Sequence, residues 1–190
     1  MTQLLIGTII ESEYELAKEV VKAAFENERY SDGTEHELVG KIRKSMNYNA
    51  ELEVVAKTES GKILGHAMMS EVTVSSDEET HTVLALAPVS VLPEYQKKGI
   101  GKALIEALEY RAYENGYVGV VVLGHAAYYH KLGYHAASEF NIYPPFEVPD
   151  ENFMFKYLWM IQQKKLKAQF IIQKLLIINN RVYLLIHDII

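Results

Sequence analysis

The chain contains no cysteine among its 190 residues. Disulfides, thiolate nucleophiles and cysteine-ligated metal sites are therefore excluded. Long apolar runs are also lacking: the longest fall well short of the roughly 20 residues that span a bilayer. The opening residues, MTQLLIGTIIESEYE, lack the basic segment of a secretory signal. We therefore expect a cytoplasmic protein with no membrane partner.

Basic charge is also in short supply. The 19 Lys and Arg residues are outnumbered by 25 Asp and Glu residues, which gives a formal net charge of −6. Such a chain is poorly suited to binding nucleic acid or an anionic membrane surface. Its 49% hydrophobic and 23% charged content is typical of a globular chain that buries a core.

The last 30 residues differ in composition from the rest. From residue 161 onward there are five basic residues and one acidic residue, and no glycine or proline. We therefore expect one domain at 1–158, followed by an atypical tail at 159–190. An added helix and strand, a dimer-forming element and a shifted reading frame are all open explanations for this tail.

Hydrophobic periodicity predicts alternating strands and helices. The strands are expected at 3–10, 51–57, 62–74, 81–91, 118–123, 133–143 and 153–159. The helices are expected at 12–25, 34–46, 99–115 and 124–132. Ser12 and Thr34 each begin a capping-box pattern, Leu16 falls on the buried stripe of the first helix, and Met46 marks the end of the second. Pro88 cannot donate to a strand ladder, which predicts a bulge or a gap in pairing.

A loop with two glycines follows the strand at 81–91. Residues 89–103, VSVLPEYQKKGIGKA, indicate a strand, a turn, a glycine loop and a helix. The first turn of a helix exposes unpaired N–H groups at the positive end of its dipole, which suits phosphate. Gly99 and Gly101 allow a ligand to approach the backbone closely. Positive charge comes from Lys97, Lys98 and Lys102.

Two common phosphate loops do not fit this stretch. A P-loop would need glycine at Gln96 and Ser or Thr at Ala103. A dinucleotide-binding fingerprint would need a third glycine where Leu104 stands.

The pattern Q-x-x-G-x-G after a strand ending in V-x-V resembles the GNAT superfamily of acyl-CoA N-acyltransferases. The resemblance implies a mixed α/β fold whose mostly antiparallel, twisted central sheet has splayed central strands and flanking helices. It implies acetyl-CoA as cosubstrate, with its pyrophosphate on the loop amides and its pantetheine arm paired to the strand. The cofactor-binding residues that it implies are Val89, Ser90, Val91, Gln96, Lys97, Lys98, Gly99, Ile100, Gly101, Lys102 and Ala103.

A second motif, AYYHKLGY at 127–134, resembles the family segment Y-x-K-x-G-F, with Tyr134 in place of Phe. The resemblance makes Tyr129 the general acid, while core packing is the alternative; Tyr128 favours packing. A thiol pKa near 8.5 and a tyrosine pKa near 10 suit proton transfer to the leaving thiolate.

Residues 123–129 and 145–154 are also similar to the YhbS-type predicted acetyltransferases, and the likeness extends over about 3–158. The family often places an asparagine after its short strand, and residues 118–129 contain none. His125 either takes part of that role or caps a surface helix.

The general base is not evident, because the strand at 81–91 carries no carboxylate. Glu71 is a candidate, and a water relay through backbone carbonyls is preferred. His125, His130 and His135 are spaced by five residues and do not share a helix face, so we expect no metal site.

We therefore expect an N-acetyltransferase that transfers acetyl from acetyl-CoA to a primary amine of a small molecule or peptide by direct attack. Acceptor contacts are expected from the loops at 27–33 and 144–150, and the acidic balance favours a cationic acceptor. A homodimer remains open. The alternatives are a non-catalytic acyl-CoA sensor and a structural protein whose glycine loop binds nothing.

Overall fold

The computed structural model describes residues 4–28, 31, 33–75, 80–158 and 182–185. Within this part the chain divides into two compact units, which share strands β3 (Ile63–Ser75) and β4 (Thr80–Val91). Unit 1 holds the chain up to residue 70 together with 86–111, and unit 2 holds 71–85 together with the chain from 112 to 185. Most of the predicted tail lies outside the described residues, as do residues 29, 30 and 32 of the predicted acceptor loop.

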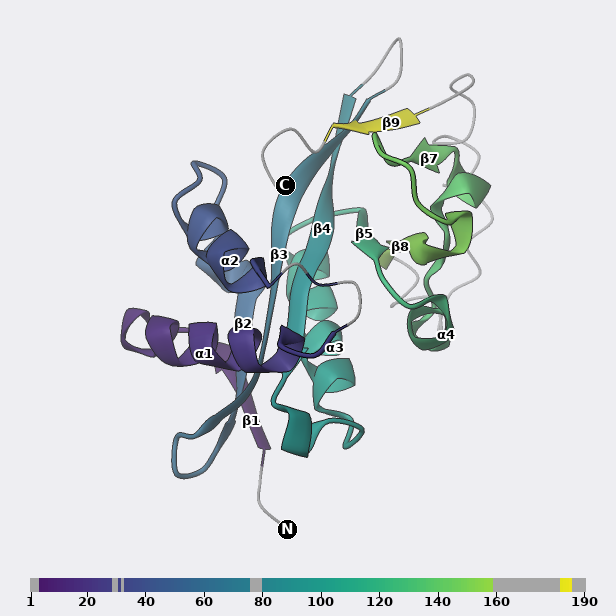
Figure 1. Cartoon of the computed structure of the whole chain (residues 1–190). Helices are drawn as coiled ribbons and strands as arrows, with labels where there is room; N and C mark the ends of the chain where they lie inside the picture. Colours follow the sequence, from purple (N-terminus) through teal and green to yellow (C-terminus); the bar gives the residue numbers. More distant parts are fainter. Residues whose placement is uncertain (1–3, 29–30, 32, 76–79, 159–181, 186–190) are drawn as a thin grey trace, which may run out of the picture. The chain divides into compact units, whose positions relative to one another are not determined.

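Unit 1 combines the first strands of the sheet with three helices (Figure 1). In chain order it contains β1 (Leu4–Thr8), α1 (Tyr14–Phe25), α2 (Glu35–Arg43), β2 (Glu53–Thr58), the first part of β3, the end of β4, and α3 (Ile100–Glu114) as far as Arg111. Both β1 with β2 and β2 with β3 pair in antiparallel fashion.

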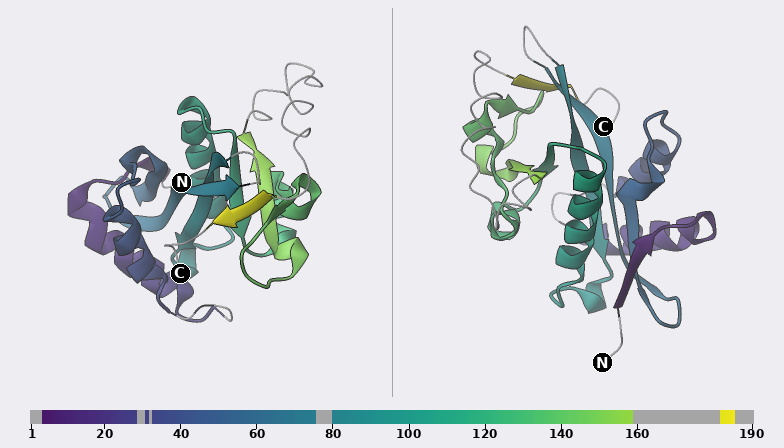
Figure 2. Two further views of the ribbon diagram at one scale, coloured as in Figure 1. Left: turned by 90° about the horizontal axis from the view of Figure 1, so that it is seen from above. Right: turned by 180° about the vertical axis from the view of Figure 1, so that it is seen from behind.

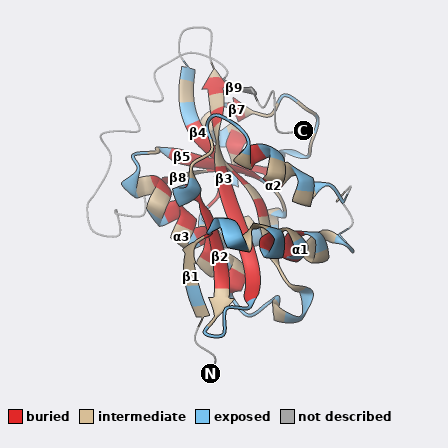
Figure 3. Cartoon of the chain, turned by 90° about the vertical axis from the view of Figure 1, so that its left-hand side faces the viewer, coloured by how far each residue is buried: buried red, intermediate tan, exposed pale blue. Residues whose placement is uncertain are grey.

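Strand alternation assigns the two faces of this sheet. Val55 lies opposite His66 in the β2–β3 ladder, and Val55 packs in a buried cluster with Ala17 of α1. On the other face, a Cβ added to Gly65 would lie 3.0 Å from Leu104 of α3. The sheet of unit 1 is therefore covered by α1 and α2 on one face and by α3 on the other (Figures 2 and 3).

Arg111, near the end of α3, ties this helix to the start of the chain. Its Nη1 donates to the Thr8 hydroxyl at 2.5 Å and to the Glu51 carbonyl at 3.1 Å. The ends of β1 and α3, about 100 residues apart in sequence, thus meet in unit 1.

Unit 2 is built mainly from short elements around one antiparallel pair. In chain order they are β5 (Gly119–Leu123), α4 (Ala126–Tyr129), β6 (His135–Ala136), β7 (Ile142–Tyr143), β8 (Phe153–Tyr157) and β9 (Val182–Leu185). Strand β8 pairs antiparallel with β5 and β6, while β9 pairs antiparallel with β3 and parallel with β7.

The hydrogen-bonded order β1-β2-β3-β4-β5-β8-β6 confirms the predicted mixed α/β fold with a mostly antiparallel sheet. Strand β4 pairs parallel with β5 through Leu84 and Ala85. Over these two fully described strands the ladder stops at Ala85, in line with the gap predicted near Pro88. Among the described residues, no helix is long and apolar enough to cross a membrane.

Several local predictions are wrong. Leu16 is exposed rather than buried, and α2 ends at Arg43, which leaves Met46 fully exposed. The amide of Ile10 donates to the Glu13 carboxylate at 3.2 Å, so the first capping interaction begins two residues before Ser12.

The single strand predicted at 133–143 is also wrong. The 3₁₀ turn at Ala137–Phe140 separates β6 from β7, and Asn141 then adopts a positive φ of 58°. A strand cannot continue through that backbone conformation.

Candidate active site

The glycine loop of unit 1 has the backbone conformation of an anion site. Lys97 and Gly99 adopt positive φ angles of 59° and 86°. A Cβ at Gly99 would meet no atom within 4 Å, so backbone conformation requires glycine here and the space beside it is open. The Gly99 carbonyl accepts from the Ala103 amide at 3.0 Å, which makes Gly99 the residue that caps α3.

The amides of Ile100, Gly101 and Lys102 form the first turn of α3. Amides at this position have no partner within the helix and lie at the positive end of its dipole. Left-handed residues just before a helix turn further N–H groups into a concave, anion-binding arrangement. Gly99 is exposed while Ile100 is buried, so this end of the helix is anchored and still open to a ligand.

Other predicted cofactor residues already have partners in the protein. Gln96 Nε2 donates to the Val91 carbonyl at 3.2 Å, which ties the loop to the end of β4. Lys98 Nζ donates to the Glu94 carbonyl at 2.9 Å, and Lys102 lies 3.7 Å from Glu106. We therefore expect these side chains to shape the loop as well as to add charge.

The predicted pantetheine segment lies at the end of β4. Val89 and Val91 are half-buried, whereas Ser90 is 1% exposed. Ser90 Oγ donates to the His66 carbonyl at 3.2 Å, which bonds β4 to β3. Unit 1 therefore brings together all the predicted cofactor residues from Val89 to Ala103.

Tyr129, the predicted general acid, belongs to unit 2 at the end of α4. Its ring forms edge contacts with Tyr128 and Tyr134 at centroid distances of 5.1 and 5.5 Å. Burial, with a smaller effect from Tyr128, raises the pKa of Tyr129 well above its usual value. The phenol therefore keeps its proton at neutral pH, although its pKa moves further from that of a thiol.

Gly124 fixes the position of the Tyr129 ring. A Cβ at Gly124 would lie 2.5 Å from Tyr129 Cε2, so only glycine leaves room for the ring. The Tyr134 amide donates to the Tyr129 carbonyl at 3.2 Å, and Tyr134, which replaces the family's Phe, is fully buried.

The two other candidates have structural contacts. Glu71 Oε1 accepts from the Tyr117 hydroxyl at 2.6 Å, and burial followed by this carboxylate raises the pKa of Tyr117 to about 12. His125 is the exposed residue that caps α4, and its carbonyl accepts the amides of Tyr128 and Tyr129. His125 therefore occupies the cap position of a surface helix, which was the alternative to a role in binding pantetheine.

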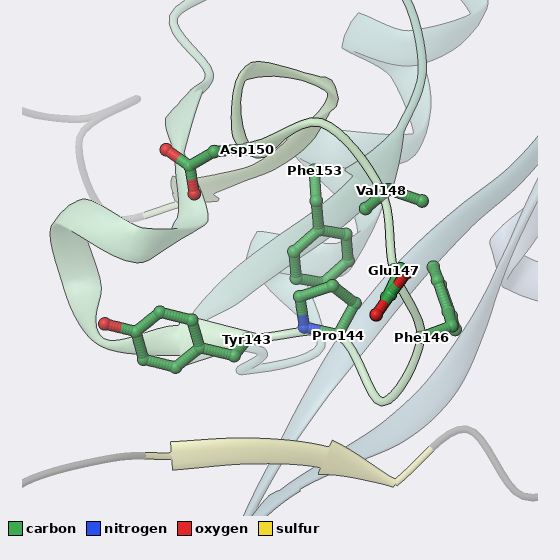
Figure 4. Close-up of a pocket in the computed structure, with 7 residues that line it drawn as sticks. All are labelled: Tyr143, Pro144, Phe146, Glu147, Val148, Asp150 and Phe153. Carbon is green, nitrogen blue, oxygen red and sulfur yellow. The ribbon is translucent and has the colours of Figure 1, made fainter.

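A pocket of about 290 Å³ lies at the predicted acceptor loop of unit 2 (Figure 4). Its lining is largely apolar and consists of Tyr143, Pro144, Phe146, Glu147, Val148, Asp150 and Phe153. Asp150 accepts a hydrogen bond from Ser138 Oγ at 2.8 Å, whereas Glu147 has no hydrogen bond or ion pair among the described residues. In Figure 4 the Glu147 carboxylate is directed toward Pro144 and the Asp150 carboxylate points away.

Sequence reasoning missed a buried polar cluster in unit 1. Glu53 and His66 are both 0% exposed, and His66 Nε2 lies 2.7 Å from Glu53 Oε1. Arg43 and Tyr48 also donate to this carboxylate. A lone Glu and a lone His inside apolar strands were the available signal. The residues that the structure describes contain no group of three or more side chains arranged to hold a metal.

Comparison with known proteins places this geometry in a family. The model of the acetyltransferase (GNAT) family matches residues 14–134. The uncharacterized N-acetyltransferase YjhQ of Escherichia coli (strain K12) is 31% identical over 138 residues, which are 72% of this chain and 74% of that protein.

Two solved structures are also similar. A GNAT family acetyltransferase from Brucella melitensis, in complex with acetyl-CoA, has 27% identity and a TM-score of 0.68, over 83% of this chain and 89% of its own. YhbS from Escherichia coli, in complex with CoA, has a TM-score of 0.74 over 96% of this chain and 90% of its own, and at 21% identity it supports the fold.

The chain therefore belongs to the acetyltransferase (GNAT) family, as the glycine loop and the tyrosine motif indicated. It is an acyl-CoA-dependent acetyltransferase of that family.

Proposed function

We propose that this enzyme transfers the acetyl group of acetyl-CoA to the primary amine of a small molecule or peptide, by direct attack of the amine on the thioester. The observation that carries this proposal is Gly99, whose positive φ opens the first turn of α3 beside free space. Exposed helix amides there suit a pyrophosphate. The similar Brucella melitensis protein was solved with acetyl-CoA, which supports acetyl-CoA as the cosubstrate.

Each part of the cofactor has a proposed contact. The amides of residues 99–102 hold the pyrophosphate, with Lys97, Lys98 and Lys102 adding positive charge. Gln96 keeps the loop bonded to the end of β4 through the Val91 carbonyl. The backbone at 89–91 pairs with the pantetheine amides in the manner of an added strand. These assignments extend the family resemblance to single residues of this chain.

Tyr129 is the proposed general acid. As the tetrahedral intermediate collapses, the C–S bond breaks and the phenol donates its proton to the leaving thiolate. The raised pKa of Tyr129 ensures that this proton is present across the neutral range. Its close fit against Gly124 holds the ring in one position.

The acceptor is proposed to bind at the pocket of the 144–150 loop. Glu147 offers a carboxylate with no partner among the described residues, and the aromatic lining offers apolar contact. A primary amine that is protonated at neutral pH matches this lining in charge. We also propose that residues 1–158 form the catalytic domain and that 159–190 form an atypical tail, whose strand β9 pairs with β3 and β7.

Calorimetry with acetyl-CoA, followed by a thiol-release assay over a panel of primary amines, tests the proposal. We expect acetyl-CoA binding and amine-dependent thiol release. The substitution Tyr129→Phe should lower the rate by about 100-fold while acetyl-CoA affinity is kept. Binding without turnover on any amine would favour the sensor alternative, and no binding would contradict both.

A further inference from the structure

The buried cluster of unit 1 contains two ionisable side chains that the proposed mechanism does not use. Glu53 and His66 are each 0% exposed. Burying a charged group costs several kcal/mol unless it is paired and hydrogen-bonded. The same sheet face otherwise carries apolar side chains such as Val55 and Met68, so the two ionisable side chains stand out from their surroundings.

The register of β2 and β3 sets where the pair points. Glu53 lies opposite Met68 and His66 opposite Val55, so all four share one face of the sheet. Met68 packs with Val21 of α1 and with residues of α2. The Glu53–His66 pair therefore faces the helices α1 and α2, away from α3.

The charged and titratable groups around the pair come from each neighbouring element. Arg43 of α2 donates to Glu53 through Nε at 3.1 Å, and Tyr48, from the segment after α2, donates to it at 2.7 Å. Tyr14 of α1 stacks under Arg43 at 3.8 Å and lies 3.4 Å from the Tyr48 hydroxyl. Burial alone would raise the pKa of Glu53, but the hydrogen bonds, from His66 first and then Arg43, lower it to about 2.

Hydrogen bonding fixes the tautomer of His66. An ionised carboxylate only accepts hydrogen bonds, so the Nε2 that lies 2.7 Å from Glu53 must carry a proton. In neutral imidazole the lone pair is then on Nδ1. Nδ1 is buried and has no hydrogen-bond partner among the described residues. A carboxylate that orients a histidine and leaves its other nitrogen free is the arrangement of a general base.

His66 also lies beside the strand that is proposed to hold pantetheine. Ser90 Oγ donates to the His66 carbonyl at 3.2 Å. The residue before it, Gly65, also lies close to β4: a Cβ added to Gly65 would be 3.0 Å from the Ser90 carbonyl oxygen. His66 is thus one strand away from residues 89–91, within the same unit.

We propose that His66, oriented by Glu53, accepts through one water molecule the proton that the acceptor ammonium group loses before attack. The proposal rests on the proposed function. Nδ1 takes one proton from the ammonium group, and the freed nitrogen lone pair forms the C–N bond with the thioester carbonyl carbon. The C–S bond then breaks, and the second proton on the attacking nitrogen passes through solvent to the leaving thiolate. His66 gives up its own proton through the water molecule that delivered it.

The substitution His66→Gln separates a base from a structural residue. Glutamine can still donate an amide N–H to Glu53, but its oxygen does not take up a proton near neutral pH. With the fastest amine of a primary alkylamine panel, we expect kcat/KM at pH 7 to fall about 100-fold. The loss should shrink as the pH approaches the amine pKa, about 10.4, because the amine then deprotonates by itself.

A matched control is His36→Gln, because His36 Nδ1 is also buried without a partner among the described residues. Among the described residues His36 has no contact with a carboxylate. The pH dependence of kcat/KM of the His36→Gln variant should therefore match that of the unchanged enzyme. Acetyl-CoA affinity and the thermal midpoint of each variant report whether the site remains intact. An equal loss for His66→Gln at every pH, or no loss, would overturn the proposal.

The substitution Tyr48→Phe tests the same idea with a smaller change, because phenylalanine keeps the ring and lacks only the hydroxyl. It removes one donor from Glu53, so the carboxylate should hold the His66 proton more tightly and move the acid limb of kcat/KM to higher pH. An unmoved limb contradicts the proposal even if His66→Gln does not fold. Failure of the unchanged enzyme to bind acetyl-CoA or release thiol would instead contradict the proposed function.

Discussion

The ring of Tyr129 lies so close to Gly124 that a Cβ there would come within 2.5 Å of Tyr129 Cε2. Replacing Gly124 with Ala must therefore displace the ring. We expect kcat to fall about 100-fold, since a misplacement of about 1 Å has that cost, while acetyl-CoA affinity is unchanged. Tyr129→Phe is the comparison, and a Gly124→Ala enzyme with full kcat would contradict a role for the phenol.

Gly99→Ala should weaken acetyl-CoA binding because alanine disfavours the φ of 86°. Gly61→Ala is a matched control, since Gly61 has a φ of 84° and also open space around it. Both variants should lose about 1 kcal/mol of unfolding free energy. Only Gly99→Ala should raise the acetyl-CoA Kd, by about tenfold, in calorimetry; equal affinities would argue against the loop as the pyrophosphate site.

Stability should depend on pH through Glu53. Its folded-state pKa of about 2 lies below the ordinary value of 4.5, so its contribution is present above the ordinary pKa. That contribution is lost as the pH falls from about 5 toward 2, and is on the order of 3 kcal/mol. Urea unfolding across this range should show the loss, and Glu53→Gln should show a smaller change. Parallel curves would contradict the assignment.

Glu147 should affect the acceptor and not the cofactor. Exposed ion pairs contribute about 0.2–1 kcal/mol, so Glu147→Gln should raise KM for a cationic amine about two- to fivefold. Added salt should narrow the difference. Glu151→Gln changes an exposed carboxylate nearby that does not line the pocket, and should leave KM unchanged. Equal KM values for both variants would place the acceptor elsewhere.

Periodicity predicted the elements that bury a regular stripe. Ile100, Leu104 and Leu108 recur every four residues and are buried along α3, and the predicted helix differs from the observed one by a single residue at each end. The exposure of Leu16 did not follow from its spacing. Which apolar side chain at the edge of a stripe stays in water is decided by the neighbouring layer.

The buried pair of the candidate site could not be predicted in the same way. Glu53 and His66 meet because of strand register, and Arg43 and Tyr48 reach them only once α2 has packed on the sheet. The pattern of the glycine loop, in contrast, lies within six consecutive residues, from Gln96 to Gly101. A motif of consecutive residues can be predicted from the sequence, whereas polar partners far apart in the chain are set by tertiary packing.

The bond from Arg111 to Thr8 has a consequence for synthesis of the chain. A ribosome must make more than 100 residues before the first strand can meet its arginine partner. Until then the emerging β1, α1 and α2 lack the helix that covers the opposite face of their sheet. Completion of unit 1 is therefore a late event during translation, and a polypeptide truncated before Leu86 should remain without a settled tertiary structure.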